Sequence, residues 1–239
     1  MLASAYQSVL RARNREEFRG EIVGFAKGLG FGTVSATMVI DHSATESEFD
    51  SIDNTPTAWT EYFKDRSTWR VDPVMQHCKR QSVPIVWNQD TYVNSGQGDL
   101  WEEQAQFGYR SGIGLALHLP EGRHFLFGVD CETELPRDAA TLTRMVADIQ
   151  LFAVYAQETA WRVIMPKAND ASSIHVRMTP RELECLKWTM DGKTAWEVSG
   201  ILGITERTVV MHLSNAMHKL DCNNKHQAVL KALRLGLIR

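Results

Sequence analysis

Hydrophobic and polar residues alternate in several short segments of the first two thirds of the chain. Residues 33–40 alternate with a period of two and are rich in β-branched side chains, which is typical of a β-strand. Residues 83–87 form a shorter segment of this kind. Residues 112–119 and 124–129 are two more, separated only by the turn Pro120-Glu-Gly122. Because strands joined by so short a turn run antiparallel, the pattern predicts an antiparallel sheet.

Helical periodicity fills much of the sequence around these strands. Asn14 followed by Glu17 is typical of a helix start, and the predicted helix runs to Lys27, before a glycine-rich stop. Further helices are predicted over residues 56–65, 73–80, 99–107 and 136–161. Helices that flank a sheet favour an α+β fold, here an α/β/α sandwich with an antiparallel sheet, and a long loop is expected after residue 40.

The end of the chain is predicted to be entirely helical. Thr179-Pro-Arg-Glu182 and Thr194-Ala-Trp-Glu197 each have the residues of a capping box at a helix start. The turn Leu202-Gly-Ile204 precedes a third helix over residues 205–220, and a fourth covers residues 225–236. A helix, a short glycine-containing turn and a second helix form a helix-turn-helix, so we expect one inside this all-α four-helix domain.

Composition and charge divide the chain at the same place. The segment 166–174 contains Pro, Asn, Asp and two Ser and has no apolar period, so we expect a linker between a domain over residues 1–165 and a helix-turn-helix domain over residues 175–239. The net charge is −3. Up to Ser173, 16 Lys or Arg stand against 23 Asp or Glu, giving −7, and the remaining residues have 10 against 6, giving +4. The basic end favours nucleic acid as a partner.

Several classes of protein do not fit the sequence. No window approaches the roughly 18 uncharged apolar residues that a membrane span needs, and no signal peptide is visible at the N-terminus. The four cysteines lie far apart and form no CxxC pair, so we expect reduced thiols in a cytoplasmic protein. His212 and His218 lie six residues apart, the wrong spacing for a shared metal. We therefore expect no metal, no cofactor and no membrane partner.

The predicted recognition helix, residues 205–220, has an outward face near its start. Five residues of this face could reach base edges in the major groove: Glu206, Arg207, Val210, Met211 and Ser214. Lys193 and the backbone of Thr194 lie at a helix start suited to a phosphate, and Lys225 adds sequence-independent attraction. These residues predict operator DNA as a partner. The alternative is a plain helical bundle with a solvated basic face.

The C-terminal segment resembles the LuxR-type helix-turn-helix. The resemblance runs from Met178 through Val209 and continues at Lys219-Leu220 and Asn224-Lys225. Three residues fall on the most invariant positions of that family: Glu182, Leu186 and Gly192. Val210 departs, because relatives often carry a polar or basic residue there. The resemblance implies a transcription factor that binds two-fold-related half-sites as a homodimer, with RNA polymerase as a partner if it activates.

The first domain resembles the acyl-homoserine-lactone receptors of that family. Four segments keep their order and spacing: Ala58-Trp59-Thr-Glu-Tyr-Phe63, Val71-Asp72-Pro73, Pro84-Ile-Val-Trp87 and Gly108-Tyr-Arg-Ser-Gly112. A buried Asp72 can accept the ligand amide N–H, the indole of Trp59 can donate to the lactone carbonyl, and Trp87 supplies a flat wall. The expected ligand-binding residues are Thr55, Trp59, Phe63, Asp72, Val74, Trp87, Tyr92, Gly112, Gly114 and Gly128. Alternatively, the tryptophans are core aromatics and Asp72 only caps the helix that begins at Pro73.

Four positions depart from the receptor pattern. Thr55 and Phe63 stand where many relatives have Tyr, and Gly128 stands where some have a Ser or Thr hydroxyl. Gly114 is smaller than some of its counterparts. We therefore expect fewer or water-mediated contacts to the acyl carbonyl, a roomier cavity near Gly114 and Gly128, and a relaxed or unusual preference for the acyl chain.

Three other functions remain as alternatives. An orphan regulator would bind DNA without a lactone and use the first domain only for folding and dimerisation. A lactone-processing enzyme would need a metal cluster such as HxHxDH or an activated nucleophile, and the sequence shows neither. A phospho-receiver domain would need alternating strands and helices from its start, whereas here a helix precedes the first strand. The sequence favours a ligand-responsive regulator over all three.

Overall fold

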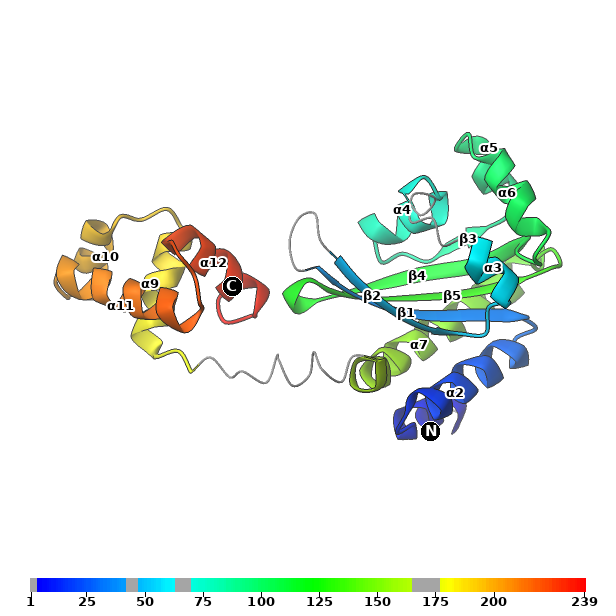
Figure 1. The fold of residues 1–239 in the computed structure, drawn as a ribbon, viewed down its shortest axis with the longest axis horizontal. Coiled ribbons are helices and arrows are strands. Elements are labelled where there is room, and N and C mark those ends of the chain that lie inside the picture. The colour runs from blue at the N-terminus through cyan, green and yellow to red at the C-terminus, as the bar shows by residue number, and fades with distance from the viewer. Residues whose placement is uncertain (1–3, 42–46, 63–69, 165–176) are drawn as a thin grey trace. The chain divides into compact units, whose positions relative to one another are not determined.

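The computed structural model describes residues 4–41, 47–62, 70–164 and 177–239. The chain divides into two compact units, one formed by most of residues 1–169 and the other by residues 170–239. The N-terminal unit contains a five-stranded antiparallel sheet in the order β2-β1-β5-β4-β3 (Figure 1). Its strands are β1 (Thr33–Asp41), β2 (Ser47–Asp53), β3 (Ile85–Trp87), β4 (Ser111–Leu119) and β5 (Arg123–Cys131).

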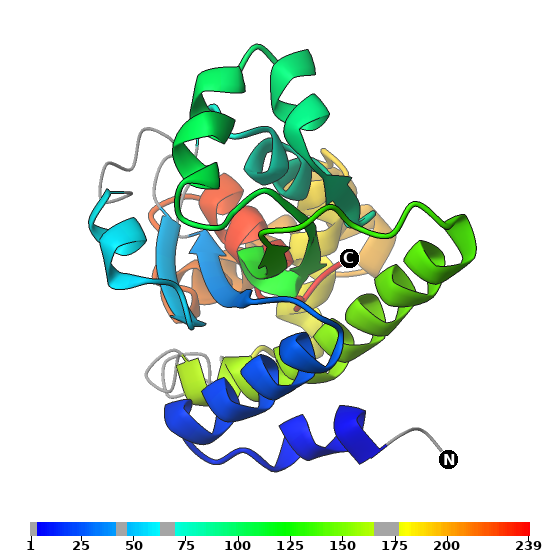
Figure 2. The ribbon, with the colours of Figure 1, turned by 90° about the vertical axis from the view of Figure 1, so that its right-hand side faces the viewer.

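One face of this sheet carries the main hydrophobic core. Helices α2 (Arg15–Gly28) and α7 (Ala139–Ile164) cover it, and both views place the two helices on the same side of the sheet (Figures 1 and 2). Phe18 of α2 and Phe152 of α7 are fully buried there with Phe125 and Phe127 of β5. The short α1 (Ser4–Ser8) and the 3₁₀ turn η1 (Val9–Arg11) precede α2. Asn14 caps α2 through its side chain, as expected.

The opposite face of the sheet carries a different set of residues. Because side chains alternate along a strand, the neighbours of the core residues point to this second face. Most of them are small or polar: Ser35 and Thr37 of β1, Gly112, Gly114 and Ala116 of β4, and Gly128 and Asp130 of β5. Above them lie α4 (Pro73–Arg80), α5 (Gln89–Asn94) and α6 (Gly98–Ala105), with α3 (Thr57–Tyr62) beside the sheet (Figure 1). An aromatic cluster, separate from the main core, forms between these helices and the sheet.

Some predicted elements differ from those observed. Strand β2 occupies part of the expected loop after residue 40; its only strong apolar residues are Phe49 and Ile52, so no alternation marked it. Helix α5 was also not predicted, because its sequence is polar. Helix α7 begins at Ala139 rather than at Pro136, since the side chain of Asp138 accepts the Thr141 N–H at 2.8 Å and so sets the helix start.

The C-terminal unit is the expected four-helix domain. Its helices are α9 (Pro180–Met190), α10 (Ala195–Leu202), α11 (Glu206–Lys219) and α12 (Lys225–Arg234). Both predicted capping boxes are present at the starts of α9 and α10. Gly203 has a φ of 66°, a left-handed conformation that suits glycine at the turn between α10 and α11. Leu186 of α9, Val198 of α10 and Val209 of α11 are fully buried and join these three helices in one core.

Within the described part of the chain, no helix is both long and apolar enough to cross a membrane. The predicted linker, residues 166–174, lies outside the described residues, as does Phe63.

Candidate functional site

Asp72 lies at the start of α4, where its carboxylate meets three donors. Oδ1 accepts the backbone N–H groups of Val74 and Met75 at 2.8 and 2.9 Å, so Asp72 does cap the helix. Oδ2 points elsewhere and accepts the hydroxyl of Tyr92 at 3.1 Å. The residue is only 6% exposed. Burial raises the pKa of Asp72, although all three hydrogen bonds act to lower it. The capping role therefore leaves one buried carboxylate oxygen directed at the aromatic cluster.

Aromatic side chains gather around Asp72. Trp87 is buried and meets Tyr92 edge to face, with ring centroids 5.7 Å apart. Trp59 stacks on Tyr109 at 4.8 Å and also contacts Phe107. Val74 and Ile85 pack against the same cluster. The structure thus brings together Trp59, Asp72, Val74, Trp87 and Tyr92, all of which were expected to bind ligand.

Three glycines were expected in this site, and the structure gives each a different environment. A Cβ at Gly112 would lie 2.4 Å from the Val129 carbonyl oxygen and 2.7 Å from Trp87 Nε1, so only glycine fits. The extra room expected at Gly114 is absent. A Cβ there would lie 3.0 Å from Val74 and 3.5 Å from Ile85, because those side chains already cover the glycine.

The space beside Gly128 is partly filled by a hydroxyl from the neighbouring strand. Ser35 of β1 is the register partner of Gly128, and its Oγ lies 3.2 Å from the position of a Cβ at Gly128. Ser35 can therefore supply a hydroxyl near the place where some relatives carry one on β5. Sequence reasoning missed Ser35, because the pairing of β1 with β5 depends on a register that no local pattern reveals.

Three further polar residues of this region were also not predicted from the sequence: Gln104, Tyr109 and Asp130. Tyr109 is 8% exposed and Gln104 is 4% exposed, yet Tyr109 Oη and Gln104 Nε2 have no hydrogen-bond partner among the described residues. The hydroxyl side chains of Thr55 and Thr33 lie close enough to the Tyr109 phenol to act to lower its pKa, whereas burial and the charge of Asp130 raise it. Burying an unsatisfied polar group costs about 1–3 kcal/mol, so these atoms suit a ligand that completes their hydrogen bonds.

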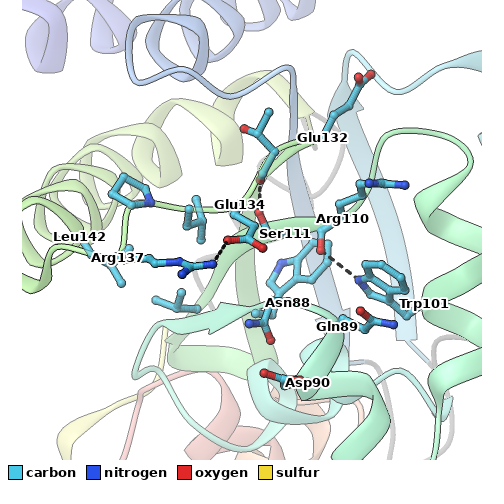
Figure 3. Close-up of a pocket in the computed structure, with 15 residues that line it drawn as sticks. Asn88, Gln89, Asp90, Trp101, Arg110, Ser111, Glu132, Glu134, Arg137 and Leu142 are labelled. Carbon is cyan, nitrogen blue, oxygen red and sulfur yellow. Dashed lines mark hydrogen bonds and ion pairs between the residues drawn. The ribbon is translucent and has the colours of Figure 1, made fainter.

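Two of the hollows near the cluster bear on where a ligand could lie. The larger, about 870 Å³, lies beside β3 and the segment after β5 (Figure 3). Its walls are mostly polar: Arg137 pairs with Glu134 at 2.8 Å, and Trp101 donates to the Arg110 carbonyl at 3.0 Å. Of the residues expected to bind ligand, its walls contain only Trp87.

The smaller hollow, about 170 Å³, lies over the same sheet face as Gly128 and Asp130. Its walls include Val39, Met75, Cys78, His118, His124 and Leu126. Leu126 is two residues from Gly128 along β5, a separation of about 7 Å in a strand. An apolar tail that leaves Asp72 and passes Gly128 would arrive in this hollow. None of the described residues expected to bind ligand lines this hollow, but it opens over the sheet face that carries Gly128.

The residues expected to read DNA form the exposed face of α11. Glu206, Arg207, Val210, Met211 and Ser214 are all exposed, and Thr205 caps the helix. Lys225 is exposed at the start of α12, whereas Lys193 is half-buried. A phosphate at the helix start formed by Lys193 and the Thr194 backbone stays a prediction, and the Thr194 N–H itself donates to Glu197 at 2.8 Å. A phosphate at this helix start would instead meet the N–H groups that follow it.

Comparisons with known proteins agree with both halves of the chain. The family model "Autoinducer binding domain" matches residues 14–160, and "Bacterial regulatory proteins, luxR family" matches residues 176–232. The transcriptional activator protein AnoR of Acinetobacter nosocomialis is 32% identical over 232 residues, which cover 96% of this chain and 95% of AnoR. The transcriptional activator protein LuxR of Aliivibrio fischeri is 30% identical over 204 residues, covering 84% and 80%.

Solved structures show the same arrangement of elements. The crystal structure of SdiA from Escherichia coli has a TM-score of 0.75 at 26% identity and covers 99% of this chain and 95% of its own. SdiA in complex with octanoyl-rac-glycerol has a TM-score of 0.72 at 27% identity, with coverages of 99% and 96%. These relatives are DNA-binding regulators rather than enzymes. The chain belongs to the LuxR family of quorum-sensing transcriptional regulators, in which an autoinducer-binding domain is followed by a LuxR-type helix-turn-helix.

Proposed function

We propose that this regulator senses an N-acyl-homoserine lactone, which binds between the second sheet face and helices α3 to α6. The observation that carries the proposal is the buried Asp72 carboxylate inside an aromatic cluster that also holds unpartnered polar atoms. An acyl-homoserine lactone has one amide N–H, two carbonyl oxygens, a small ring and an apolar tail. The site offers a matching group for each.

The amide N–H is the part of the ligand that Asp72 recognises. Oδ2 of Asp72 already accepts one hydrogen bond, from Tyr92, and a carboxylate oxygen has capacity for a second. The lactone ring then lies against Trp87, and the indole N–H of Trp59 donates to the lactone carbonyl. The acyl tail runs across Gly128 into the hollow beside Met75 and Leu126.

The protein divides its work between the two units. The autoinducer-binding domain covers residues 1–165, residues 166–174 are the linker, and residues 175–239 read DNA. Arg207, Val210 and Met211 on the exposed face of α11 enter the major groove of each half-site. Two copies bind as a homodimer to a two-fold-related operator, and the activator relatives suggest RNA polymerase as the further partner.

Asp72→Asn provides a sharp test of the anchor. Asparagine caps a helix as well as aspartate does, so α4 should keep its start. If the amide oxygen of asparagine caps the helix, its N–H₂ group faces Tyr92 and the ligand. An N–H₂ group donates hydrogen bonds and cannot accept them. We expect the full-length variant to fold but to bind an N-acyl-homoserine lactone at least about tenfold more weakly, a loss of about 1.4 kcal/mol.

The measurement is mass spectrometry of small molecules extracted from protein expressed with mixed lactones, with isothermal titration for the affinities. Glu103→Gln, an exposed carboxylate on α6, is the matched control. Equal binding by Asp72→Asn and the parent protein would remove the anchor assignment. If no lactone is extracted and the yield does not depend on lactone, the receptor function itself fails.

One observation favours a second ligand class. A solved structure of SdiA, which shares this fold, is a complex with octanoyl-rac-glycerol, an acyl ester with free hydroxyl groups. A glycerol hydroxyl can donate to Asp72 in place of an amide N–H. Extraction of an acylglycerol instead of a lactone from the expressed protein would support this alternative.

A further inference from the structure

We propose that Asp130, held in its neutral form, and Tyr109 make a second polar anchor that donates hydrogen bonds to the acyl carbonyl oxygen of the ligand. This inference rests on the proposed function, because it assigns residues within the same site. It answers a specific gap: the shorter Thr55 stands where many relatives carry Tyr, and Gly128 stands where some relatives carry a Ser or Thr hydroxyl. Neither Asp130 nor Tyr109 was expected to bind ligand from the sequence.

The position of Asp130 follows from the sheet register. Asp130 of β5 is the partner of Gly112 on β4 and points to the same sheet face as Gly128, two residues earlier. Asp130 Oδ1 and Trp87 Nε1 each lie 2.7 Å from the place that a Cβ on Gly112 would occupy. The absence of a side chain at Gly112 is therefore what lets the carboxyl group and the indole approach one another above the strand.

The two carboxyl groups of the site have unequal surroundings. Asp72 accepts hydrogen bonds from Val74, Met75 and Tyr92, all of which stabilise its ionised form. The side chain of Asp130 accepts none from the described residues. When two carboxylates share a poorly solvated space, the one with fewer donors takes up the proton. Asp130 is that group, and a protonated carboxyl is a hydrogen-bond donor.

The electrostatics agree with this assignment. Burial raises the pKa of Asp130 to about 8, and the charge of Asp72 adds to the effect. Taken as a whole residue, Asp130 is half-buried. The other titratable groups that act across this space include Cys78 of α4, Tyr92 of α5 and Tyr109 ahead of β4, and all three have raised pKa values. Asp53 of β2 acts on Tyr109 from the far side.

Tyr109 supplies the second donor. Its hydroxyl is buried and has no partner among the described residues, while its ring stacks on Trp59, which is expected to hold the lactone. The charge of Asp130 affects its pKa, so the two groups lie in one neighbourhood. A ligand carbonyl oxygen placed between Tyr109 and Asp130 would accept one hydrogen bond from the phenol hydroxyl and one from the neutral carboxyl group.

The test is binding of N-octanoyl-homoserine lactone to the full-length protein between pH 6.5 and 8.5. Mass spectrometry monitors how much of the lactone ring has opened at each pH, so that only the intact ligand is counted. For a pKa near 8, the neutral fraction of Asp130 falls about fourfold over this interval, so the parent affinity should fall about fourfold. Asp130→Asn keeps a donor and cannot titrate, and we expect it to bind within about threefold of the parent at pH 6.5 without the pH dependence. Asp130→Ala and Tyr109→Phe should each bind about threefold to tenfold more weakly at pH 6.5.

The outcomes separate the two proposals. If the parent binds and Asp130→Asn retains the fourfold loss, or if Asp130→Ala binds as tightly as the parent, the second anchor is wrong. If Asp130→Ala does not fold, the pH profile of Asp130→Asn decides alone. Absence of lactone binding in the parent contradicts the proposed function. NMR can follow the titration of the Asp130 carboxyl, which is identified as the signal that the parent shows and Asp130→Asn lacks. This measurement tests the neutral form of Asp130 independently of ligand binding, and a titration midpoint near pH 4 would show that the neutral form is wrong.

Discussion

At the scale of single residues, Gly112 controls the geometry of the candidate ligand site. Trp87 and Asp130 both lie so close to Gly112 that a Cβ atom on any other residue at position 112 would clash with them. A site built around a missing side chain is hard to predict from sequence, because a glycine in a strand more often indicates a bulge or a weak strand. The resemblance to known receptors identified Trp59, Asp72 and Trp87, but the roles of Asp130 and Tyr109 depend on strand register and on buried atoms without partners.

The fit at Gly112 gives a prediction about stability. In Gly112→Ala the Cβ would lie 2.4 Å from a backbone oxygen, which cannot move without distorting the sheet, so we expect a loss of about 3 kcal/mol in the free energy of unfolding. Gly24→Ala is the control. Gly24 is exposed within α2 with nothing within 4 Å of its Cβ position, so alanine there should stabilise by about 0.5–1 kcal/mol. Chemical denaturation measures both, and equal effects of the two substitutions would contradict this account.

At the scale of elements, strong local signals were read correctly and weak ones were not. Helix α4 has the bounds expected from Asp72-Pro73, and α2 begins at the expected cap. The edge strand β2 and the short α5 carry no hydrophobic period, although the capping box of Asn88 and Thr91 at the start of α5 is a local signal. The α9 capping box shows how a local signal gains a tertiary role: Glu182 closes the box and also pairs with Lys219 of α11 at 2.8 Å.

Glu182 therefore joins two helices, and removing it should weaken the C-terminal unit. Its side chain is 3% exposed and that of Lys219 is 35% exposed. Glu182→Ala loses both the box and the pair, and we expect a cost of about 2 kcal/mol. Glu182→Gln keeps the box and should cost about 1 kcal/mol. Hydrogen exchange of peptides from α9 and α11 in the full-length protein measures the change. Unaltered protection in Glu182→Ala would refute the role.

The same pair gives a pH dependence. Burial acts to raise the pKa of Glu182, but the hydrogen bonds from Lys219 and Thr179 outweigh it and hold the pKa below the ordinary value. A carboxyl whose pKa is lowered by folding contributes stability above its unfolded pKa of about 4.3, and this contribution is lost as the pH falls through the folded value. The C-terminal unit of the parent should thus lose more protection below about pH 4 than that of Glu182→Gln.

At the scale of the whole molecule, the net charge of −3 is the sum of an acidic sensor at −7 and a basic DNA-reading end at +4. A charge of +4 attracts phosphate only modestly, so pairing two copies increases both the attraction and the number of bases read. The acidic sensor adds nothing to this attraction. Lysines of equal charge should therefore differ in their effect on DNA binding according to the unit that carries them.

Lys225 and Lys27 make this comparison directly. Both are exposed, but Lys225 begins α12 in the basic unit, whereas Lys27 lies in the last turn of α2 in the acidic unit. If Lys225 contacts a phosphate, Lys225→Ala should reduce the dependence of log affinity on log salt by about 1 per protomer. Lys27→Ala should leave that slope unchanged.

Fluorescence anisotropy of the full-length, lactone-loaded protein on a duplex, measured from about 50 to 200 mM salt, resolves the difference. Because the electrostatic effect does not depend on base sequence, the duplex need not contain the operator. A slope that changes equally in the two variants would mean that the whole molecule, rather than its basic end, governs the attraction to DNA.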